Sequence, residues 1–353
     1  MSAVQKKQRD AVPVVASAIP DLTRLLDIVA AFSGQTIALV GDLVLDQFVS
    51  GEISRVSREA PVLILRHRQT RAYPGGGANA LNNLADLGAK VLPVGAVGDD
   101  AFGGKLLDYF ASKKIDVTGI EIARGWTTPT KTRFLAGWTH STEQQVLRVD
   151  DEPSVPLPPS VQASLEKKIR DRVRAANAML VSDYGFGAAT PSLMESIRDS
   201  KLTTLDSRHS LLEFDESGIT AATPNEAELE ELAHVRIGNN LEILEELGRR
   251  TLEEVGLKAL LVTRGKDGMA LFEPGEPTRL VPIYGSEQAA DVTGAGDTVI
   301  AVFTLALAAG ATYLEAAHLA SYAGGIVVMK RGTATVTSVE LENAVRSIAT
   351  SSR

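Results

Sequence analysis

Largely unbroken runs of apolar residues recur along the chain, and each is followed by a polar residue or a glycine. The clearest runs cover residues 36–40, 178–181, 202–205 and 260–263. Because apolar and polar residues do not alternate within them, these runs indicate strands buried on both faces, as in a parallel sheet. Helix-length segments separate the runs. We therefore expect an α/β fold with a doubly wound, mostly parallel sheet flanked by helices.

Two stretches depart from this alternation. Residues 43–73 and 130–149 contain strand-like segments and no clear helix, so we interpret them as a small β-sheet that forms a lid over a ligand. Residues 1–20 carry basic side chains and a short apolar part broken by Pro13. We expect them to form a mobile N-terminal extension rather than a signal peptide, followed by a single domain over residues 21–353.

Residues 291–298 read Asp-Val-Thr-Gly-Ala-Gly-Asp-Thr and precede an apolar, helix-like segment at residues 299–309. Small residues at a helix N-terminus expose N–H groups and the positive end of the helix dipole, which together form an anion site. Asp297 cannot itself bind an anion there, since like charges repel. We interpret it as a base that takes a proton from a hydroxyl during phosphoryl transfer. The alternative is that Asp297 only caps the helix.

The overall composition restricts the class of protein. The chain has 353 residues, 44% of them hydrophobic, and a net charge of −8, which argues for a soluble, cytoplasmic protein and against nucleic-acid binding. Because the chain has no cysteine, disulfides and thiol catalysis are excluded. No apolar run reaches the roughly 18 to 20 residues that span a membrane. The five histidines have no metal-ligand spacing.

The stretch at residues 291–298 resembles the D-x-x-G-A-G-D motif of the ribokinase-like (PfkB) sugar kinases. The resemblance implies that Asp297 is the catalytic base and that the backbone of Gly294, Ala295 and Gly296 forms the anion hole. It also implies ATP and Mg²⁺ as cofactors, and a monovalent cation such as K⁺ near Asp291 and Thr293.

Other motifs of the same family follow in the same order along the chain. Gly76, Gly77 and Asn79 resemble the G-G-x-x-N motif, in which glycines let sugar hydroxyls approach the backbone and the Asn binds them. Asn225 and Glu228 resemble the N-x-x-E motif, linked to the Mg²⁺-bound phosphates through water; taken alone, they would be an N-cap and a solvated Glu. The family also has a nucleotide loop, T-x-G-x-x-G, which is resembled by Thr263, Arg264, Gly265 and Gly268.

Within this family the chain resembles the D-glycero-D-manno-heptose 7-phosphate kinases of ADP-heptose synthesis. The resemblance implies transfer of the ATP γ-phosphoryl group to the anomeric hydroxyl, giving a 1,7-bisphosphate. Many such kinases continue into a C-terminal nucleotidyltransferase, and we expect none in this chain. The stretches that carry the resemblance are residues 41–46, 54–62, 144–150, 182–185 and 291–300.

The substrate contacts are expected at the ends of strands and on the lid. Asp42 follows a predicted strand, where ligands of open α/β sheets bind. Gln145 and Asp183 lie in stretches that carry the resemblance. A sugar phosphate also needs a cationic anchor, which the second lid stretch offers. The expected contacts are therefore Asp42, Gln145 and Asp183, with Lys131, Arg133 and Arg148 as the anchor.

One departure from the heptose kinase pattern bears on the substrate. The resemblance leads us to expect lysine at Phe186, and a second lysine is replaced by Arg208. A kinase for another sugar or sugar phosphate is therefore an alternative, which a substrate panel with ATP would separate. A non-catalytic sugar or nucleotide sensor is another, although Asp297 is present. Because exposed sheet edges tend to be covered, we also expect a homodimer formed through the lid.

Overall fold

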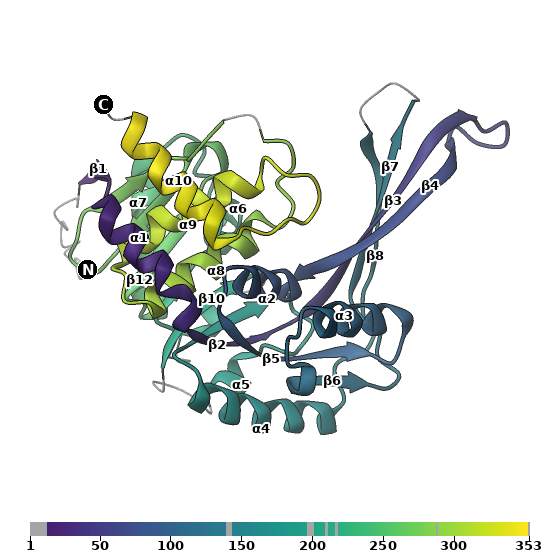
Figure 1. Cartoon of the computed structure of the whole chain (residues 1–353), viewed down its shortest axis with the longest axis horizontal. Coiled ribbons are helices and arrows are strands. Elements are labelled where there is room, and N and C mark those ends of the chain that lie inside the picture. Colours follow the sequence, from purple (N-terminus) through teal and green to yellow (C-terminus); the bar gives the residue numbers. More distant parts are fainter. Residues whose placement is uncertain are drawn as a thin grey trace, which may run out of the picture.

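The computed structural model describes residues 13–138, 143–195, 201–208, 211–215, 218–286 and 289–351. Two parts are visible in Figure 1: a body of helices packed on a large sheet, and an arm of long strands that projects from it. The arm is formed by β3, β4, β7 and β8, and we call it the lid.

The large sheet has ten strands in the part of the chain that the structure describes, in the order β1-β14-β13-β12-β11-β10-β9-β2-β5-β6. All neighbours run parallel except β13, which is antiparallel to β12 and β14. The strands are β1 (Val14–Ala16), β2 (Thr36–Gly41), β5 (Lys90–Gly98), β6 (Ile120–Ala123), β9 (Ala178–Asp183), β10 (Leu202–Ser207), β11 (Ala221–Ala222), β12 (Ala259–Thr263), β13 (Met269–Phe272) and β14 (Thr278–Val281). The predicted mostly parallel sheet is thus confirmed.

Helices cover both faces of this sheet and form two hydrophobic cores, which is the doubly wound arrangement. The first core packs under α1 (Leu22–Ala30), α2 (Gly77–Asp86), α3 (Ala101–Ser112), α8 (Ala295–Ala308), α9 (Tyr313–Val327) and α10 (Ser338–Ser351). The second packs under α4 (Pro159–Ala175), α5 (Pro191–Glu195), α6 (Glu226–Ala233) and α7 (Leu241–Val255). Short 3-10 helices lie at Phe32–Gly34, Val117–Gly119, Leu211–Phe214 and Gly265–Asp267.

The lid is a separate four-stranded sheet in the order β4-β3-β7-β8. Its strands are β3 (Leu43–Val56), β4 (Leu63–Gly76), β7 (Thr130–Gly137) and β8 (Gln144–Asp151). Both lid stretches expected from the sequence therefore form one sheet. Because β3 follows β2 directly and β4 leads directly into α2, the base of the lid is part of the same edge of the body where β2 ends.

The N-terminal segment differs from the mobile extension that we expected. Val14–Ala16 form β1, which pairs in parallel with β14, and the Ser17 N–H donates to Leu280 O at 2.9 Å. The pairing satisfies backbone groups on an otherwise open sheet edge. Residues 1–12 lie outside the described part. No helix among the described residues is long and apolar enough to cross a membrane.

Candidate active site

Asp297 lies in the first turn of α8 and does not cap it. The N-cap is Gly294, whose φ of +79° is in the left-handed region that favours glycine. A Cβ at Gly294 would meet Asn79 Nδ2 at 2.5 Å, so the close approach of Asn79 also requires glycine there. The capping interpretation of Asp297 is therefore wrong, because its carboxylate accepts hydrogen bonds from side chains of other elements.

The Asp297 carboxylate is buried, with 4% of the residue exposed, and each oxygen has a donor. Asn79 Nδ2 on α2 donates to Oδ2 at 3.0 Å, and the Tyr184 hydroxyl donates to Oδ1 at 2.7 Å. Burial raises the pKa of the Asp297 carboxyl to about 6, while the two hydrogen bonds oppose the rise. A carboxylate with this pKa is ionised at neutral pH and basic enough to accept a proton.

Open space adjoins the start of α8, where N–H groups of the first helical turn lack intrahelical partners. No atom lies within 4 Å of the position that a Cβ at Gly296 would take. Ala295 and Gly296 also line a pocket of the body. The predicted anion hole therefore faces a space that a ligand can enter.

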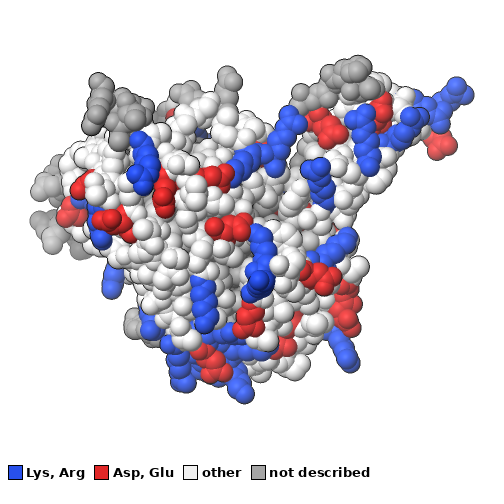
Figure 2. Space-filling view, viewed as in Figure 1, with Lys and Arg blue, Asp and Glu red and all other residues white. Residues whose placement is uncertain are grey.

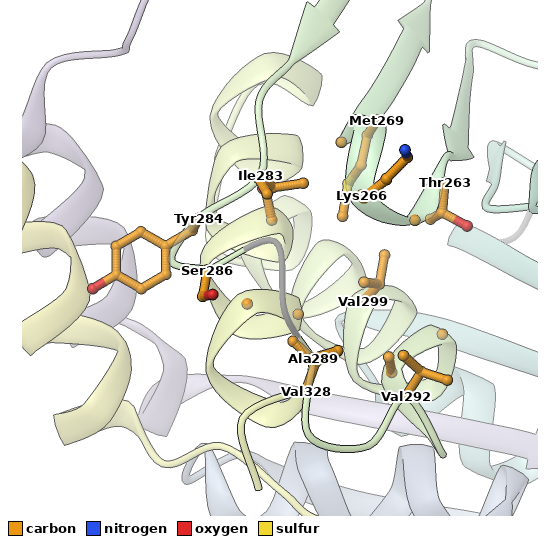
Figure 3. A pocket seen from close by; sticks show the side chains of 17 residues that line it. Thr263, Lys266, Met269, Ile283, Tyr284, Ser286, Ala289, Val292, Val299 and Val328 are labelled. Carbon is orange, nitrogen blue, oxygen red and sulfur yellow. The ribbon is translucent and has the colours of Figure 1, made fainter. Parts of the chain in front are cut away.

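This pocket has a volume of about 220 Å³ and lies between the β12–β13 turn, α8 and α9. Figure 3 shows Lys266 and Met269 on one side of it and Val292 and Val328 on the other. Its walls are mostly apolar, which suits a flat ring system, and it ends at the polar turn at the start of α8.

The predicted nucleotide loop forms one wall of that pocket. Thr263, Gly265 and Gly268 line it, whereas the Arg264 side chain forms an ion pair with Glu226 at 2.7 Å. Gly268 has a φ of +80°, and a Cβ there would meet Val281 O at 2.2 Å. A side chain at this position would therefore displace the loop.

Asn225 and Glu228 form a capping box at the start of α6. The Asn225 side chain accepts the Glu228 N–H at 2.9 Å, and Glu228 Oε2 accepts the Asn225 N–H at 2.8 Å. The sequence analysis left this helix-capping role open as an alternative. The capping box does not neutralise the charge of the Glu228 carboxylate. Burial raises the pKa of the Glu228 carboxyl, and burial together with Glu228 and Asp297 raises the pKa of Asp206 well above its usual value. The Arg208 charge opposes both shifts, and a cation bound nearby would likewise favour the ionised carboxylates.

Asp42 has a different set of contacts from the expected sugar hydroxyls. Its carboxylate accepts the N–H groups of Tyr184, Phe186 and Ala188 at 2.8, 3.0 and 2.9 Å. Three alternate N–H groups of one loop thus converge on one buried carboxylate. Asp42 fixes the loop that follows β9, and burial raises its pKa to about 6.

Asp46 is a site residue that the sequence analysis missed. Arg133 donates to Oδ1 at 2.5 Å and the Thr333 hydroxyl donates to Oδ2 at 2.9 Å. A Cβ at Gly75 would meet the Asp46 carboxylate at 2.5 Å, so the glycine run allows close approach here. Its contacts come from Arg133 and Thr333, which are distant in the sequence, so no local pattern indicated this role.

The expected cationic anchor is divided in the structure. Arg133 is buried and pairs with Asp46, and Arg148 is exposed and pairs with Asp150 at 2.9 Å. Lys131 instead lies over the ring of Tyr184 at 5.2 Å, and Arg208 lies over the same ring at 4.6 Å. The three lid cations therefore have three different partners, and Lys131 and Arg208 are the two cations that lie over Tyr184.

The remaining predicted contacts lie at varied distances from this centre. Gln145 is exposed on β8. Asp183 accepts the Gly185 N–H at 2.9 Å and the Ser207 hydroxyl at 2.7 Å, and so links the ends of β9 and β10. Gly76 and Gly77 form the tight start of α2, where a Cβ would meet Val44 at 2.9 Å or the Asp42 carbonyl at 2.8 Å.

Asp291 accepts N–H groups from Thr293 at 3.0 Å and Gly332 at 2.9 Å. Burial alone would raise the pKa of the Asp291 carboxyl, but these hydrogen bonds lower that pKa below its usual value. No cluster of three or more His, Cys, Asp or Glu side chains suited to a metal ion occurs among the described residues. A divalent ion here would be held chiefly by ligand phosphates and water, as Mg²⁺ often is.

A buried carboxylate at a helix N-terminus, with open space and a pocket beside it, is the arrangement expected of a phosphotransferase that acts on an alcohol group. Residues 36–340 match the pfkB family carbohydrate kinases, and the chain belongs to this family of sugar kinases.

Curated relatives extend this result. The chain is 37% identical over 320 residues to the bifunctional protein HldE of Desulfatibacillum aliphaticivorans, covering 89% of this chain and 64% of the relative. It is 38% identical over 316 residues to HldE of Geobacter sulfurreducens, covering 88% and 63%. The chain thus spans slightly less than two thirds of the length of these relatives.

Solved structures share the fold. Arabidopsis thaliana ribokinase complexed with ribose and ATP matches with a TM-score of 0.69 at 20% identity, over 88% of this chain and 99% of that one. Escherichia coli phosphofructokinase-2 in complex with potassium matches with a TM-score of 0.70 at 16% identity, over 89% and 99%. The fold is therefore ribokinase-like.

Proposed function

We propose that this kinase transfers the γ-phosphoryl group of ATP to the anomeric hydroxyl of D-glycero-D-manno-heptose 7-phosphate. The observation that carries the chemistry is the buried Asp297 carboxylate beside the glycine turn of α8. The sequence resemblance to heptose kinases and the similarity to the HldE proteins support the choice of sugar.

In the proposed reaction Asp297 accepts the proton of the sugar hydroxyl as that oxygen attacks the γ-phosphorus. A new O–P bond forms, the bond to the β-phosphate oxygen breaks, and ADP leaves. The N–H groups at the start of α8 stabilise the charge that spreads over the transferring oxygens. Bound Mg²⁺ would neutralise phosphate charge, and in this proposal Glu228 and Asn225 would hold it through water.

The sugar itself would lie between the base of the lid and α2. We propose that Asp46 and Asn79 contact its hydroxyls, because Asn79 donates to Asp297 and the charge of Asp46 acts on Asp297. The distant phosphate would meet Lys131 and Arg208. Burial and the charge of Arg208 lower the pKa of Lys131, so a bound phosphate would restore a favourable partner for its charged form.

A substrate panel tests the sugar assignment. Wild-type enzyme with ATP should prefer heptose 7-phosphate over the unphosphorylated heptose, fructose 6-phosphate and free hexoses. Preference for an unphosphorylated sugar would reject the assignment, and the absence of lysine at Phe186 would then account for the difference.

The phosphate anchor is tested by Lys131→Ala and Arg208→Ala, with Arg148→Ala as the matched control on the lid. Charge-assisted hydrogen bonds are worth roughly 1.5 to 3 kcal/mol, so each test variant should raise KM for the sugar phosphate about ten- to a hundred-fold. KM for ATP and for the unphosphorylated sugar should change little, and Arg148→Ala should resemble wild type. Equal effects on both sugars would place the phosphate elsewhere.

We further propose a cytoplasmic homodimer joined through the lid, and a K⁺ site near Asp291 and Thr293. Rates measured in K⁺ and in a bulky organic cation at equal ionic strength test the latter, with equal rates excluding a K⁺ requirement.

A further inference from the structure

Tyr184 connects the catalytic base to two cations and to the loop after β9. Its hydroxyl donates to Asp297 Oδ1 at 2.7 Å, although Tyr184 follows β9 and Asp297 lies in α8, 113 residues away in the sequence. Its ring is buried, with Lys131 at 5.2 Å and Arg208 at 4.6 Å from the centroid. Asp42 fixes its backbone N–H at 2.8 Å.

We propose that Tyr184 is a positioning residue that orients the Asp297 carboxylate and stabilises its ionised form through the phenol hydrogen bond. The inference rests on Asp297 being the base of the proposed function. Each carboxylate oxygen can accept two hydrogen bonds, so Oδ1 can hold the phenol and still receive the sugar hydroxyl. Asn79 supports the other oxygen at 3.0 Å.

The small residue at position 76 is part of the same arrangement. A Cβ at Gly76 would lie 3.1 Å from the Tyr184 ring, so the ring packs directly on the glycine turn that begins α2. The phenol is therefore confined between this turn and the two cations, and it keeps one orientation toward Asp297. A hydroxyl held this firmly in a buried site contributes more to the ionised carboxylate than one in water.

Several charged groups surround this pair and set its protonation. Arg208 and Asp46 face Asp297, while Asp206, Arg208 and Lys131 face Tyr184. Burial and the Asp297 charge raise the pKa of the Tyr184 phenol well above its usual value, so the phenol remains a donor across the working range. Asp42, whose pKa is also near 6, bonds the Tyr184 backbone and not its hydroxyl.

The test is the pH profile of kcat/KM for Tyr184→Phe, which keeps the ring and its cation contacts. Wild type should lose activity below about pH 6, where Asp297 gains its proton. Without the phenol, the ionised form loses a charge-assisted hydrogen bond, so the acid limb should move up by about one pH unit. At pH 8 the variant should recover much of its rate. Tyr109→Phe, which removes a hydroxyl 3.4 Å from Asn82, is the matched control and should follow wild type.

A uniform loss at every pH, or an unmoved acid limb, would show that Tyr184 is only structural and would overturn the proposal. A wild-type profile without an acid limb would instead reject Asp297 as the base, so the two failures are distinguishable. Should Tyr184→Phe not fold, 3-fluorotyrosine replaces all six tyrosines of the wild-type chain. Its more acidic phenol is a stronger donor and should shift the acid limb to lower pH. An acid limb that does not shift would again contradict the positioning role.

Discussion

Two buried aspartates, Asp42 and Asp297, show how surroundings decide the use of one residue type. Burial raises the pKa of both to about 6. Asp42 accepts three backbone N–H groups and holds a loop, whereas Asp297 has side-chain donors and adjoins the open space at Gly296. A raised pKa alone therefore does not mark a catalytic carboxylate, because a ligand must also be able to reach it.

An ionised Asp297 should weaken the fold. Its pKa is near 6 in the folded chain and near 4 in the unfolded chain, so the folded state retains the proton over that window. Stability thus falls as pH rises from 4 to 6, by about 1 to 3 kcal/mol. We expect Asp297→Asn to melt at a higher temperature than wild type at pH 8, with a smaller difference at pH 5. Equal melting temperatures at both pH values would contradict this electrostatic account.

Local motifs indicated Asp297, Asn79 and Gly268 because each role depends on residues close in sequence. Asp46 and Tyr184 could not be assigned in this way. Their roles depend on which side chains from distant elements meet: Asp46 pairs with Arg133, 87 residues away, and Tyr184 reaches Asp297, 113 residues away. Asp42 was assigned to the sugar because strand ends usually face ligands, but the loop after β9 lies over its carboxylate.

At the scale of elements, two helices begin with the same capping motif but differ in what surrounds it. α6 and α9 begin with the same capping box, Asn225–Glu228 and Thr312–Glu315. Burial raises the pKa of Glu228, whereas Glu315 lies in an exposed box near Arg24. The same local structure therefore serves in one case near the proposed phosphate site and in the other only at a helix end.

Glu228→Gln separates charge from capping, because Gln also satisfies a capping box. We expect the variant to need several-fold more Mg²⁺ for half-maximal rate, with a melting temperature close to wild type. Glu315→Gln is the matched control and should leave the Mg²⁺ requirement unchanged. An identical Mg²⁺ dependence in all three proteins would remove Glu228 from the metal site.

Element positions were predictable where burial is uniform. β2, β9, β10 and β12 occur where the apolar runs lie, and α8 follows the glycine turn. β1 was missed because three residues that add to a sheet edge leave no periodic signal. β4 extends to Gly76, beyond the expected end of the lid stretch at residue 73, because it pairs with β3 as far as Leu43.

At the scale of the whole molecule, the lid carries a group of exposed apolar side chains. Its exposed apolar side chains are Val56, Val62, Leu63, Trp138, Val146, Leu147 and Val149. Figure 2 shows charged side chains around this arm, with basic groups prominent toward its end. The edge strands β4 and β8 also carry unpaired backbone groups. A second copy of the lid would cover both features.

Leu147→Asp should therefore convert the proposed homodimer to a monomer in sedimentation experiments at micromolar concentration, since a buried charge without a partner opposes association. Val339→Asp places the same charge at an exposed site on α10 and should leave the dimer intact. A wild-type monomer, or equal behaviour of the two variants, would contradict lid pairing.

The central claim is that Asp297 removes the proton from the acceptor hydroxyl, and kcat of Asp297→Asn with ATP and the preferred sugar tests it most directly. The substitution keeps the size of the side chain, but it replaces one carboxylate oxygen with an amide NH2 group and removes the basicity. Loss of a general base lowers a rate by on the order of 10² to 10⁴. We predict a loss of this size with ATP binding and the fold retained, whereas turnover close to that of wild type would contradict the mechanism.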